Sequence, residues 1–175
     1  MTTRTVSIII VVALLAVGLI ALLSTSDSSS GSVALEAKAV TWHRLDEGVA
    51  LARQQNKKIL IDVYTDWCGW CKKMDKEVYT NEKVGQLIAT NFIAVKLDAE
   101  SQNGASFGGT LMDEASVART LGATGYPTTV FLDSEAKPIT KIAGYMEPKE
   151  FVNVIGYIGE DHYKTKSFGD YKASR

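Results

Sequence analysis

The stretch that decides the fold is Trp67-Cys68-Gly69-Trp70-Cys71. The apolar run Ile59–Tyr64 precedes it, and the helix-forming run Lys72–Glu77 follows it. A short apolar run followed by helix formers predicts a strand that passes into a helix, with both cysteines in the first helical turn. Free N–H groups and the dipole at a helix N-terminus favour negative charge, so the first cysteine should ionise more easily than a free thiol. The spacing therefore offers a nucleophilic thiol and a second thiol that can close a disulfide with it.

Composition limits the chemistry that this chain can perform. The 175 residues carry a net charge of −1, which gives no global field that would attract nucleic acid. The chain has two cysteines, both in the motif, so a framework stapled by several disulfides is excluded. A zinc site needs about four ligands. Only His43 and His162 could join the two cysteines, and neither is near them in sequence, which favours redox chemistry over metal binding.

The N-terminus is apolar from residue 6 to residue 23, interrupted only by Ser7 and Gly18. A stretch of about 18 such residues can span a bilayer, whereas the apolar part of a cleavable signal is about 7–15 residues long. Arg4 lies before the stretch, and the next Lys or Arg after it is Lys38. The positive-inside rule then keeps the N-terminus in the cytoplasm and exports the rest of the chain.

These features predict a cytoplasmic N-terminus at residues 1–5, a transmembrane signal anchor at residues 6–23 and a flexible Ser-rich linker at residues 24–40. A cleaved signal peptide is the alternative, because Ser24-Thr25-Ser26 offers a tolerable cleavage site. The predicted location is periplasmic or extracytoplasmic in both cases. The domain is anchored in the inner (cytoplasmic) membrane in the first case and secreted in soluble form in the second.

The rest of the chain divides into a domain at residues 41–163 and a polar C-terminal tail at residues 164–175, which is expected to be partly loose. Apolar periodicity, capping residues and β-branched runs predict the elements of the domain. Helices are expected near residues 45–56, 68–78, 82–90, 113–121 and 148–158, strands near 59–64, 92–98, 128–133 and 139–145, and a polar, Gly-rich loop at 99–110. This order predicts an α/β fold in which helices flank both faces of a central mixed β-sheet.

Residues 41–163 resemble the thioredoxin superfamily. More narrowly, they are similar to the exported thioredoxin-like domains related to the C-terminal domain of transmembrane thiol:disulfide interchange proteins. Four landmarks occur in the family's order: Asp62 six residues before the first cysteine, the motif Trp67–Cys71, the strand Val95–Asp98 and the sequence Gly125–Thr128. The resemblance implies a thioredoxin-like fold and thiol–disulfide exchange.

Four catalytic roles are expected within this resemblance. Cys68, nearer the helix start, is expected to be the attacking thiolate and the more exposed cysteine, and Cys71 the resolving thiol. Asp62 resembles the buried acid that takes the proton from the resolving thiol, although an aspartate that reaches solvent at a strand edge is the alternative. Lys96 occupies the position of that acid's basic partner, with a plain solvated lysine as the alternative.

Five residues are expected to contact the substrate: Trp67, Gly69, Trp70, Tyr126 and Pro127. In the family the proline is cis and exposes the preceding backbone for strand-like pairing with a substrate, whereas the alternative is an ordinary turn proline. Trp70 replaces the proline that is usual in thioredoxin, and Tyr126 precedes the expected cis-proline. Trp67 is expected to be partly packed, and Trp70 to be exposed at the start of the helix.

The predicted function is a thiol–disulfide oxidoreductase that acts on disulfides of partner proteins outside the cytoplasm, in the reducing direction. It needs no cofactor beyond the redox-active Cys68–Cys71 disulfide, and no nucleic acid is expected as a partner. Because the compartment is oxidising, a membrane thiol carrier is expected to donate the electrons. The alternatives are oxidation of substrate thiols, a non-catalytic module that binds or chaperones a partner, and a protein that handles copper or zinc with its thiols.

Overall fold

The structure is a computed structural model that describes residues 40–175. The predicted cytoplasmic N-terminus, the predicted anchor at residues 6–23 and all but the last residue of the predicted linker lie outside the described residues. Among the helices of residues 40–175, none is long and apolar enough to cross a membrane. The account that follows therefore concerns the predicted domain and the C-terminal tail.

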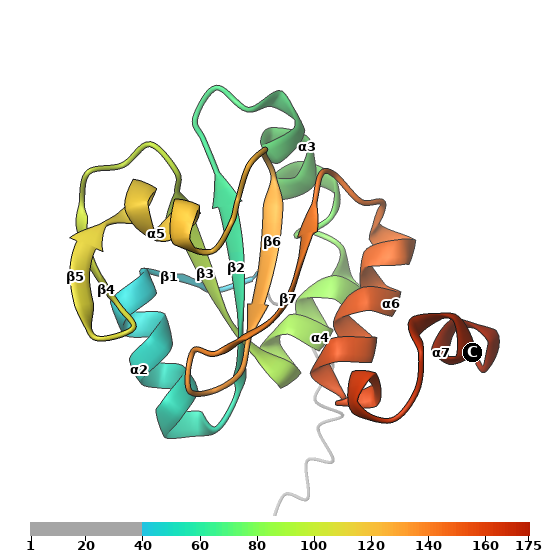
Figure 1. Cartoon of the computed structure of the whole chain (residues 1–175). Coiled ribbons are helices and arrows are strands. Elements are labelled where there is room, and N and C mark those ends of the chain that lie inside the picture. Colours follow the sequence, from blue (N-terminus) through green and yellow to red (C-terminus); the bar gives the residue numbers. More distant parts are fainter. Residues whose placement is uncertain (1–39) are drawn as a thin grey trace, which may run out of the picture. The chain divides into compact units, whose positions relative to one another are not determined.

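A five-stranded mixed sheet forms the centre of the domain (Figure 1). Its order is β1-β3-β2-β6-β7, in which β1, β3 and β2 run parallel, β6 is antiparallel to β2, and β7 is antiparallel to β6. The strands are β1 (Trp42–His43), β2 (Lys58–Tyr64), β3 (Phe92–Asp98), β6 (Thr128–Leu132) and β7 (Pro138–Ala143). Central strands that are buried on both faces read as continuous apolar runs, which explains why β2, β3 and β6 were predictable.

Helices cover both faces of the sheet, as the sequence predicted. Ile59, Ile61 and Val63 of β2 belong to a core on one face, which also contains apolar residues of α2 (Leu45–Gln55) and α5 (Glu114–Thr120). Leu60 of the same strand belongs to the core on the other face. That second core contains residues of α3 (Gly69–Glu77), α4 (Glu82–Asn91) and α6 (Pro148–Gly159). Alternate residues of one strand therefore hold two helical layers.

Two strand features differ from the prediction. The short edge strand β1 was not predicted, and the loop expected at residues 99–110 contains β4 (Gly104–Phe107), which forms a hairpin with the following strand β5 (Thr110–Asp113). Gly108 and Gly109, both at positive φ (60° and 81°), form its two-residue connection. A pair of glycines is a common hairpin turn because both positions need left-handed backbone angles. The polar composition of this segment concealed the pairing.

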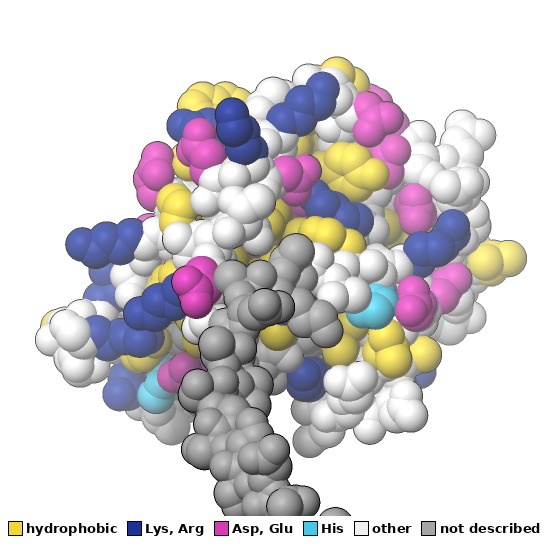
Figure 2. Space-filling model, turned by 180° about the vertical axis from the view of Figure 1, so that it is seen from behind, with side chains coloured by type: hydrophobic (Ala, Val, Ile, Leu, Met, Phe, Trp, Pro, Cys, Tyr) yellow, Lys and Arg dark blue, Asp and Glu magenta, His cyan; other side chains and the backbone are white. Residues whose placement is uncertain are grey.

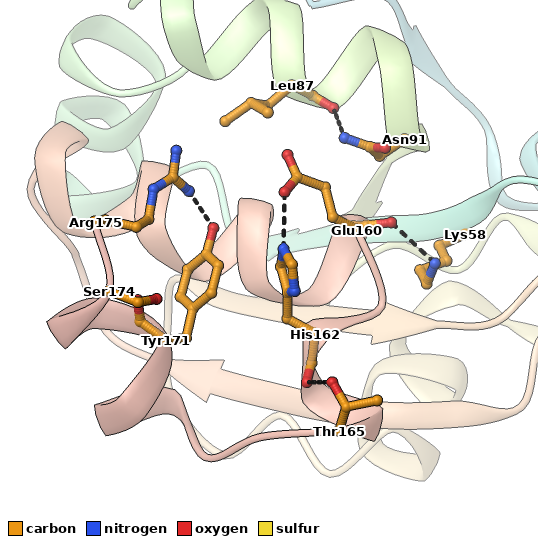
Figure 3. Close-up of polar contacts among 10 residues, drawn as sticks. Lys58, Leu87, Asn91, Glu160, His162, Thr165, Tyr171, Ser174 and Arg175 are labelled. Atoms are coloured by element: carbon orange, nitrogen blue, oxygen red, sulfur yellow. Dashed lines mark hydrogen bonds and ion pairs between the residues drawn. The ribbon is translucent and has the colours of Figure 1, made fainter.

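The C-terminal tail, expected to be partly loose, is packed against the domain. The 3-10 helix η1 (His162–Lys164) leads from the domain into the tail, and the tail contains the helix α7 (Phe168–Ala173). Tyr171 of α7 is only 3% exposed and accepts a hydrogen bond from Arg175, while the His162 ring contacts Glu160 at 3.1 Å (Figure 3). Lys172 pairs with Glu150 of α6 at 2.8 Å. The Lys172–Glu150 pair joins residues that are 22 positions apart in sequence and meet only in the folded chain, so the sequence pattern did not predict it.

Candidate active site

Four loops of the candidate site meet at one edge of the sheet. The cysteine motif follows the C-terminal end of β2, and Glu100 follows the C-terminal end of β3, which is parallel to β2. Tyr126 and Pro127 precede β6, which runs antiparallel to β2, so the start of β6 lies at the same edge. Tyr145 follows β7, which is antiparallel to β6 and therefore also ends there. Figure 1 shows this edge at the top, where α3 begins.

The two cysteines form a disulfide at the start of α3. Their sulfur atoms are 2.06 Å apart, and Cys68 is the N-cap residue of the helix. The backbone N–H of Cys71 donates a hydrogen bond to Sγ of Cys68 at 3.0 Å. Both cysteines are buried, with 4% and 2% of their surfaces exposed, so the expected difference in exposure is slight. A helix N-terminus with an N–H aimed at Sγ stabilises a thiolate there.

Asp62, Lys96 and Asp75 form a line of charged groups from the core to the surface. Asp62 and Lys96 lie opposite each other on β2 and β3. Nζ of Lys96 donates to Oδ2 of Asp62 at 2.6 Å and to Oδ1 of Asp75 at 2.5 Å. The Asp62 side chain is fully buried and that of Asp75 is 47% exposed. The alternative of an aspartate that reaches solvent is therefore wrong for Asp62.

Burial raises the pKa of Asp62 above its ordinary value, although the charge of Lys96 opposes the shift. Burial alone would lower the pKa of Lys96, but the carboxylates of Asp62 and Asp75 outweigh burial and raise it. The ammonium of Lys96 also lies over the rings of Trp42 and Tyr64, at 4.8 and 5.0 Å from their centroids. Lys96 is therefore not a plain solvated lysine, but a paired cation held in an aromatic environment.

The alternation of β2 places Asp62 under α3. Leu60 and Asp62 are two residues apart and point to the same face of the sheet, and Leu60 packs in the core that contains Met74 of α3. Cys71 and Met74 are the buried residues of α3, so Cys71 faces the same layer. Asp75 lies four residues after Cys71, on the same side of the helix. The second cysteine therefore lies in the layer that also holds both carboxylates.

Trp67 differs from its expected partial burial, because 67% of its surface is exposed. Its Nε1 donates to Oε1 of Glu100 at 2.9 Å, and its ring makes an edge-to-face contact with Tyr126 at 6.1 Å. The expected cis peptide bond between Tyr126 and Pro127 is present. A Cβ added to Gly69 would meet no atom within 4 Å, so the space above this residue is open. Trp67, the neighbour of Cys68 in sequence, therefore brings Tyr126 and Glu100 beside the cysteine motif.

Trp70 is 58% exposed, as expected, and is held by contacts that sequence reasoning missed. Its ring lies 5.5 Å from that of Tyr145, and the ammonium of Lys73 lies over both rings. Glu100, Tyr145 and Asp75 are thus neighbours of the site that the sequence did not reveal. Only for Asp75 was there a local signal, its helical spacing from Cys71.

Charged side chains of both signs are interspersed on the face drawn in Figure 2, in keeping with a net charge near zero. His43 and His162, the remaining candidates for a metal site, contact Glu47 and Glu160 instead. Within the described residues, no three side chains of His, Cys, Asp or Glu gather closely enough to hold a metal ion.

The raised pKa of Asp62 predicts a pH dependence of stability. Between about pH 4, where an unfolded aspartate titrates, and the higher pKa of the folded state, the native protein binds more protons than the unfolded chain. The free energy of unfolding should therefore fall as pH rises through this window, by at most about 1.4 kcal/mol per pH unit. Urea unfolding of the oxidised protein measures this slope.

The Asp62→Asn variant should lack that fall. The difference between its free energy of unfolding and that of the wild type should therefore shift in favour of the variant as pH rises. Asp66→Asn, which removes an exposed carboxylate four residues away, controls for the loss of one charge. Parallel curves for the wild type and Asp62→Asn would contradict the account of Asp62.

Comparison with known proteins places the chain in a family. A family model described as a thioredoxin-like domain matches residues 45–159, more than half of the chain. The thiol:disulfide interchange protein DsbD of Yersinia pestis (strain Pestoides F) is 29% identical over 104 residues, which cover 58% of this chain and 16% of the relative. The chain thus spans about a sixth of the length of this curated relative.

Two solved structures have the same fold. A thioredoxin-fold protein from Helicobacter pylori superposes with a TM-score of 0.61 and 21% identity, over 69% of this chain and 80% of its own. The structure described as DsbH oxidoreductase superposes with a TM-score of 0.57 and 18% identity, and the match covers 78% of this chain and 95% of that one. The chain therefore belongs to the thioredoxin-like domain family, and it carries a disulfide-oxidoreductase-like domain with a Cys68–Cys71 pair.

Proposed function

We propose that the protein is a thiol–disulfide oxidoreductase that reduces disulfides of partner proteins. The observation that carries the proposal is the Cys68–Cys71 disulfide at the start of α3, where the N–H of Cys71 is directed at Sγ of Cys68. A thiolate at that sulfur is stabilised by the N–H group and by the helix dipole. The same two cysteines can store the two electrons that a disulfide requires, without a further cofactor.

The reaction begins with the reduced protein. The Cys68 thiolate attacks one sulfur of a partner's disulfide, forms a mixed disulfide with it, and releases the partner's other sulfur as a thiolate. Cys71 then loses its proton to Asp62, and its thiolate attacks Sγ of Cys68. The mixed disulfide breaks, the partner's second sulfur leaves as a thiolate, and the Cys68–Cys71 disulfide forms. Two electrons pass from the protein to its partner, and the released thiolates take protons from solvent.

Asp62 is suited to this step because its raised pKa allows the carboxyl group to accept a proton at a pH where an exposed aspartate stays ionised. It lies under the helix that carries Cys71. Lys96 contacts Asp62 rather than the sulfur atoms, so we assign it a positioning role through the 2.6 Å hydrogen bond. The substrate contacts are assigned to Trp67, Gly69, Trp70, Tyr126 and Pro127, which surround the disulfide.

The carboxylates also favour the reducing direction. Asp62 and Asp75 place negative charge in the layer of the resolving cysteine, with one ammonium between them. Negative charge disfavours a thiolate and so favours the disulfide over the dithiol. A pair that prefers to be oxidised gives its electrons to partners. The start of α3 acts in the opposite direction on Cys68, and we propose that the carboxylates outweigh it.

The predicted anchor at residues 6–23 supports a location outside the cytoplasm, held at the inner membrane. Disulfides persist in such oxidising compartments, so a reductase there needs electrons from elsewhere. We propose a membrane thiol carrier as the donor. The likeness to a protein named a thiol:disulfide interchange protein supports exchange of this kind.

Replacing the resolving cysteine should trap the partner. In Cys71→Ser, the Cys68 thiolate still attacks, but no second thiol breaks the mixed disulfide. In cell extracts this variant should therefore form covalent adducts with partner proteins. The adducts should be visible on non-reducing gels and should disappear when a reducing agent is added. Cys68→Ser is the matched control, and it should form at least about tenfold fewer adducts, because the remaining Cys71 thiol is not at the N-cap position whose sulfur accepts a backbone N–H, and the carboxylates of its layer disfavour its thiolate. Equal trapping by both variants, or trapping by neither, would count against the enzyme and favour a binding module.

The anchor is tested by fractionation. The full chain should sediment with membranes and stay there in high salt, because a span of about 18 apolar residues is held by burial rather than by charge. A variant that lacks residues 1–23 should remain in the soluble fraction. A full-length chain that is released as a shortened, soluble form would instead support the cleaved signal peptide.

A further inference from the structure

A cleft of about 850 Å³ lies between the start of α4, the start of α6 and the C-terminal tail. Of the charged residues that line it, four are basic and one, Glu147, is acidic. The basic residues are Lys83 of α4, Lys149 of α6, Lys172 of α7 and Arg175. A concave surface lined mainly by charges of one sign concentrates their field and attracts the opposite charge. The cleft is therefore cationic although the whole chain has a net charge of −1.

Two of the four cations remain available for an anion from outside the chain. Lys172 pairs with Glu150 at 2.8 Å, and the Arg175 guanidinium donates to a tyrosine hydroxyl. Lys83 and Lys149 are exposed, and within residues 40–175 neither forms an ion pair. Both ammonium groups can therefore pair with anionic groups of a second molecule without breaking an ion pair of the domain.

The cleft begins next to the edge of the sheet where α3 starts. Glu147, which lines the cleft, lies two residues after Tyr145, so their Cα atoms are at most about 7 Å apart. The Tyr145 ring is 5.5 Å from that of Trp70, which stands between the two cysteines. Figure 1 shows the chain passing from the end of β7, at this edge, directly into α6. A partner whose sulfur reacts with Cys68 can therefore reach the cleft with a neighbouring segment.

Negative charge lies on the other side of the same edge. Asp98 is the last residue of β3, and Glu100 follows it. The backbone N–H of Glu100 donates to Oδ1 of Asp98 at 2.9 Å, which holds the two residues in one turn. In the sheet, β3 and β7 lie on opposite sides of β2. An acidic segment is therefore repelled on the β3 side and attracted to the cleft beyond β7, which fixes the orientation in which it approaches.

We propose that this cleft binds an acidic segment of the partner protein, with several Asp or Glu residues near the reacting disulfide. The inference rests on the proposed function and names a feature of its substrates. Carboxylates of the segment pair with Lys83 and Lys149. A protein segment suits the cleft better than a membrane does, because the lining is concave and lies beside the cysteines. Basic surfaces that bind anionic lipids are instead polybasic segments or faces of amphipathic helices.

The test compares two peptides that contain the same disulfide and differ only in the segment that follows it. One segment carries several Glu residues, and the other carries Gln in the same places. The reduced full chain in a neutral detergent should reduce the acidic peptide with a kcat/KM about fivefold higher at low salt, since complementary charges speed association. The ratio should approach one in about 1 M salt, where the Debye length is about 3 Å.

Reversing a charge of the cleft should remove this preference. In Lys149→Glu the ratio should fall to about one or less, because a carboxylate then faces the acidic segment, and Lys83→Glu should act in the same direction. Lys137→Glu is the matched control, because it changes the net charge equally. Lys137 is exposed between β6 and β7, at the ends of these strands that lie away from the cysteines. This variant should keep the preference of the wild type.

Labelling of lysines with a water-soluble acylating reagent locates the binding in the wild-type chain. The oxidised full chain is used, so that the peptide binds without reacting. At a peptide concentration equal to Kd, where half of the sites are occupied, the labelling of Lys83 and Lys149 should slow about twofold. The labelling of Lys137, followed by mass spectrometry in the same sample, should not change.

Equal rates of the wild type on both peptides at low salt would overturn the inference and leave the proposed function standing. An equal loss of the preference in Lys137→Glu and Lys149→Glu would also overturn it, since the net charge rather than the cleft would then select the peptide. Protection of Lys83 and Lys149 by vesicles of phosphatidylglycerol, but not by the acidic peptide, would assign the cleft to the membrane and overturn it as well. Reduction of neither peptide would overturn the proposed function too.

Discussion

The position of β2 at the centre of the sheet determines the rest of the site. Its apolar residues are buried on both faces of the sheet, which fixes the strand in place. Its C-terminal end therefore determines where α3 begins, with Cys68 as the N-cap residue. Because β3 and β7 run in the same direction as β2 and β6 runs against it, their loops reach the same edge. The cysteines, the cis-proline and both tryptophans are thus brought together by the directions of four strands.

Two electrostatic influences of opposite sign act on the cysteine pair. The start of α3 and the N–H of Cys71 favour negative charge on Cys68. Asp62 is buried under the helix and Asp75 lies on it, and their negative charges disfavour a thiolate at Cys71, which lies in the same layer. Lys96 makes the buried carboxylate tolerable, because a charge in the core is costly unless it is paired. We therefore propose that the redox behaviour of the pair is coupled to the Asp62–Lys96 ion pair within the core of the domain.

The sequence predicted those features that depend on local pattern. The central strands, the placement of the cysteines in the first turn of α3, and the cis-proline could be inferred from short motifs and from a family resemblance. The β4–β5 hairpin, α7 and the contacts of Trp67 could not, because they depend on partners such as Glu100 that become neighbours only on folding. Tyr145 lies 75 positions after Trp70, and no sequence pattern predicts that their rings are in contact.

The measurement that tests the account most directly is the reduction potential of the Cys68–Cys71 pair in the full chain, equilibrated with glutathione buffers. If the carboxylates outweigh the start of α3, the potential should lie near that of thioredoxin, at roughly −270 mV. A potential near the oxidising end of the family, at roughly −120 mV, would mean that the reduced form is the stabilised one. The protein would then donate disulfides, which would contradict the direction proposed here.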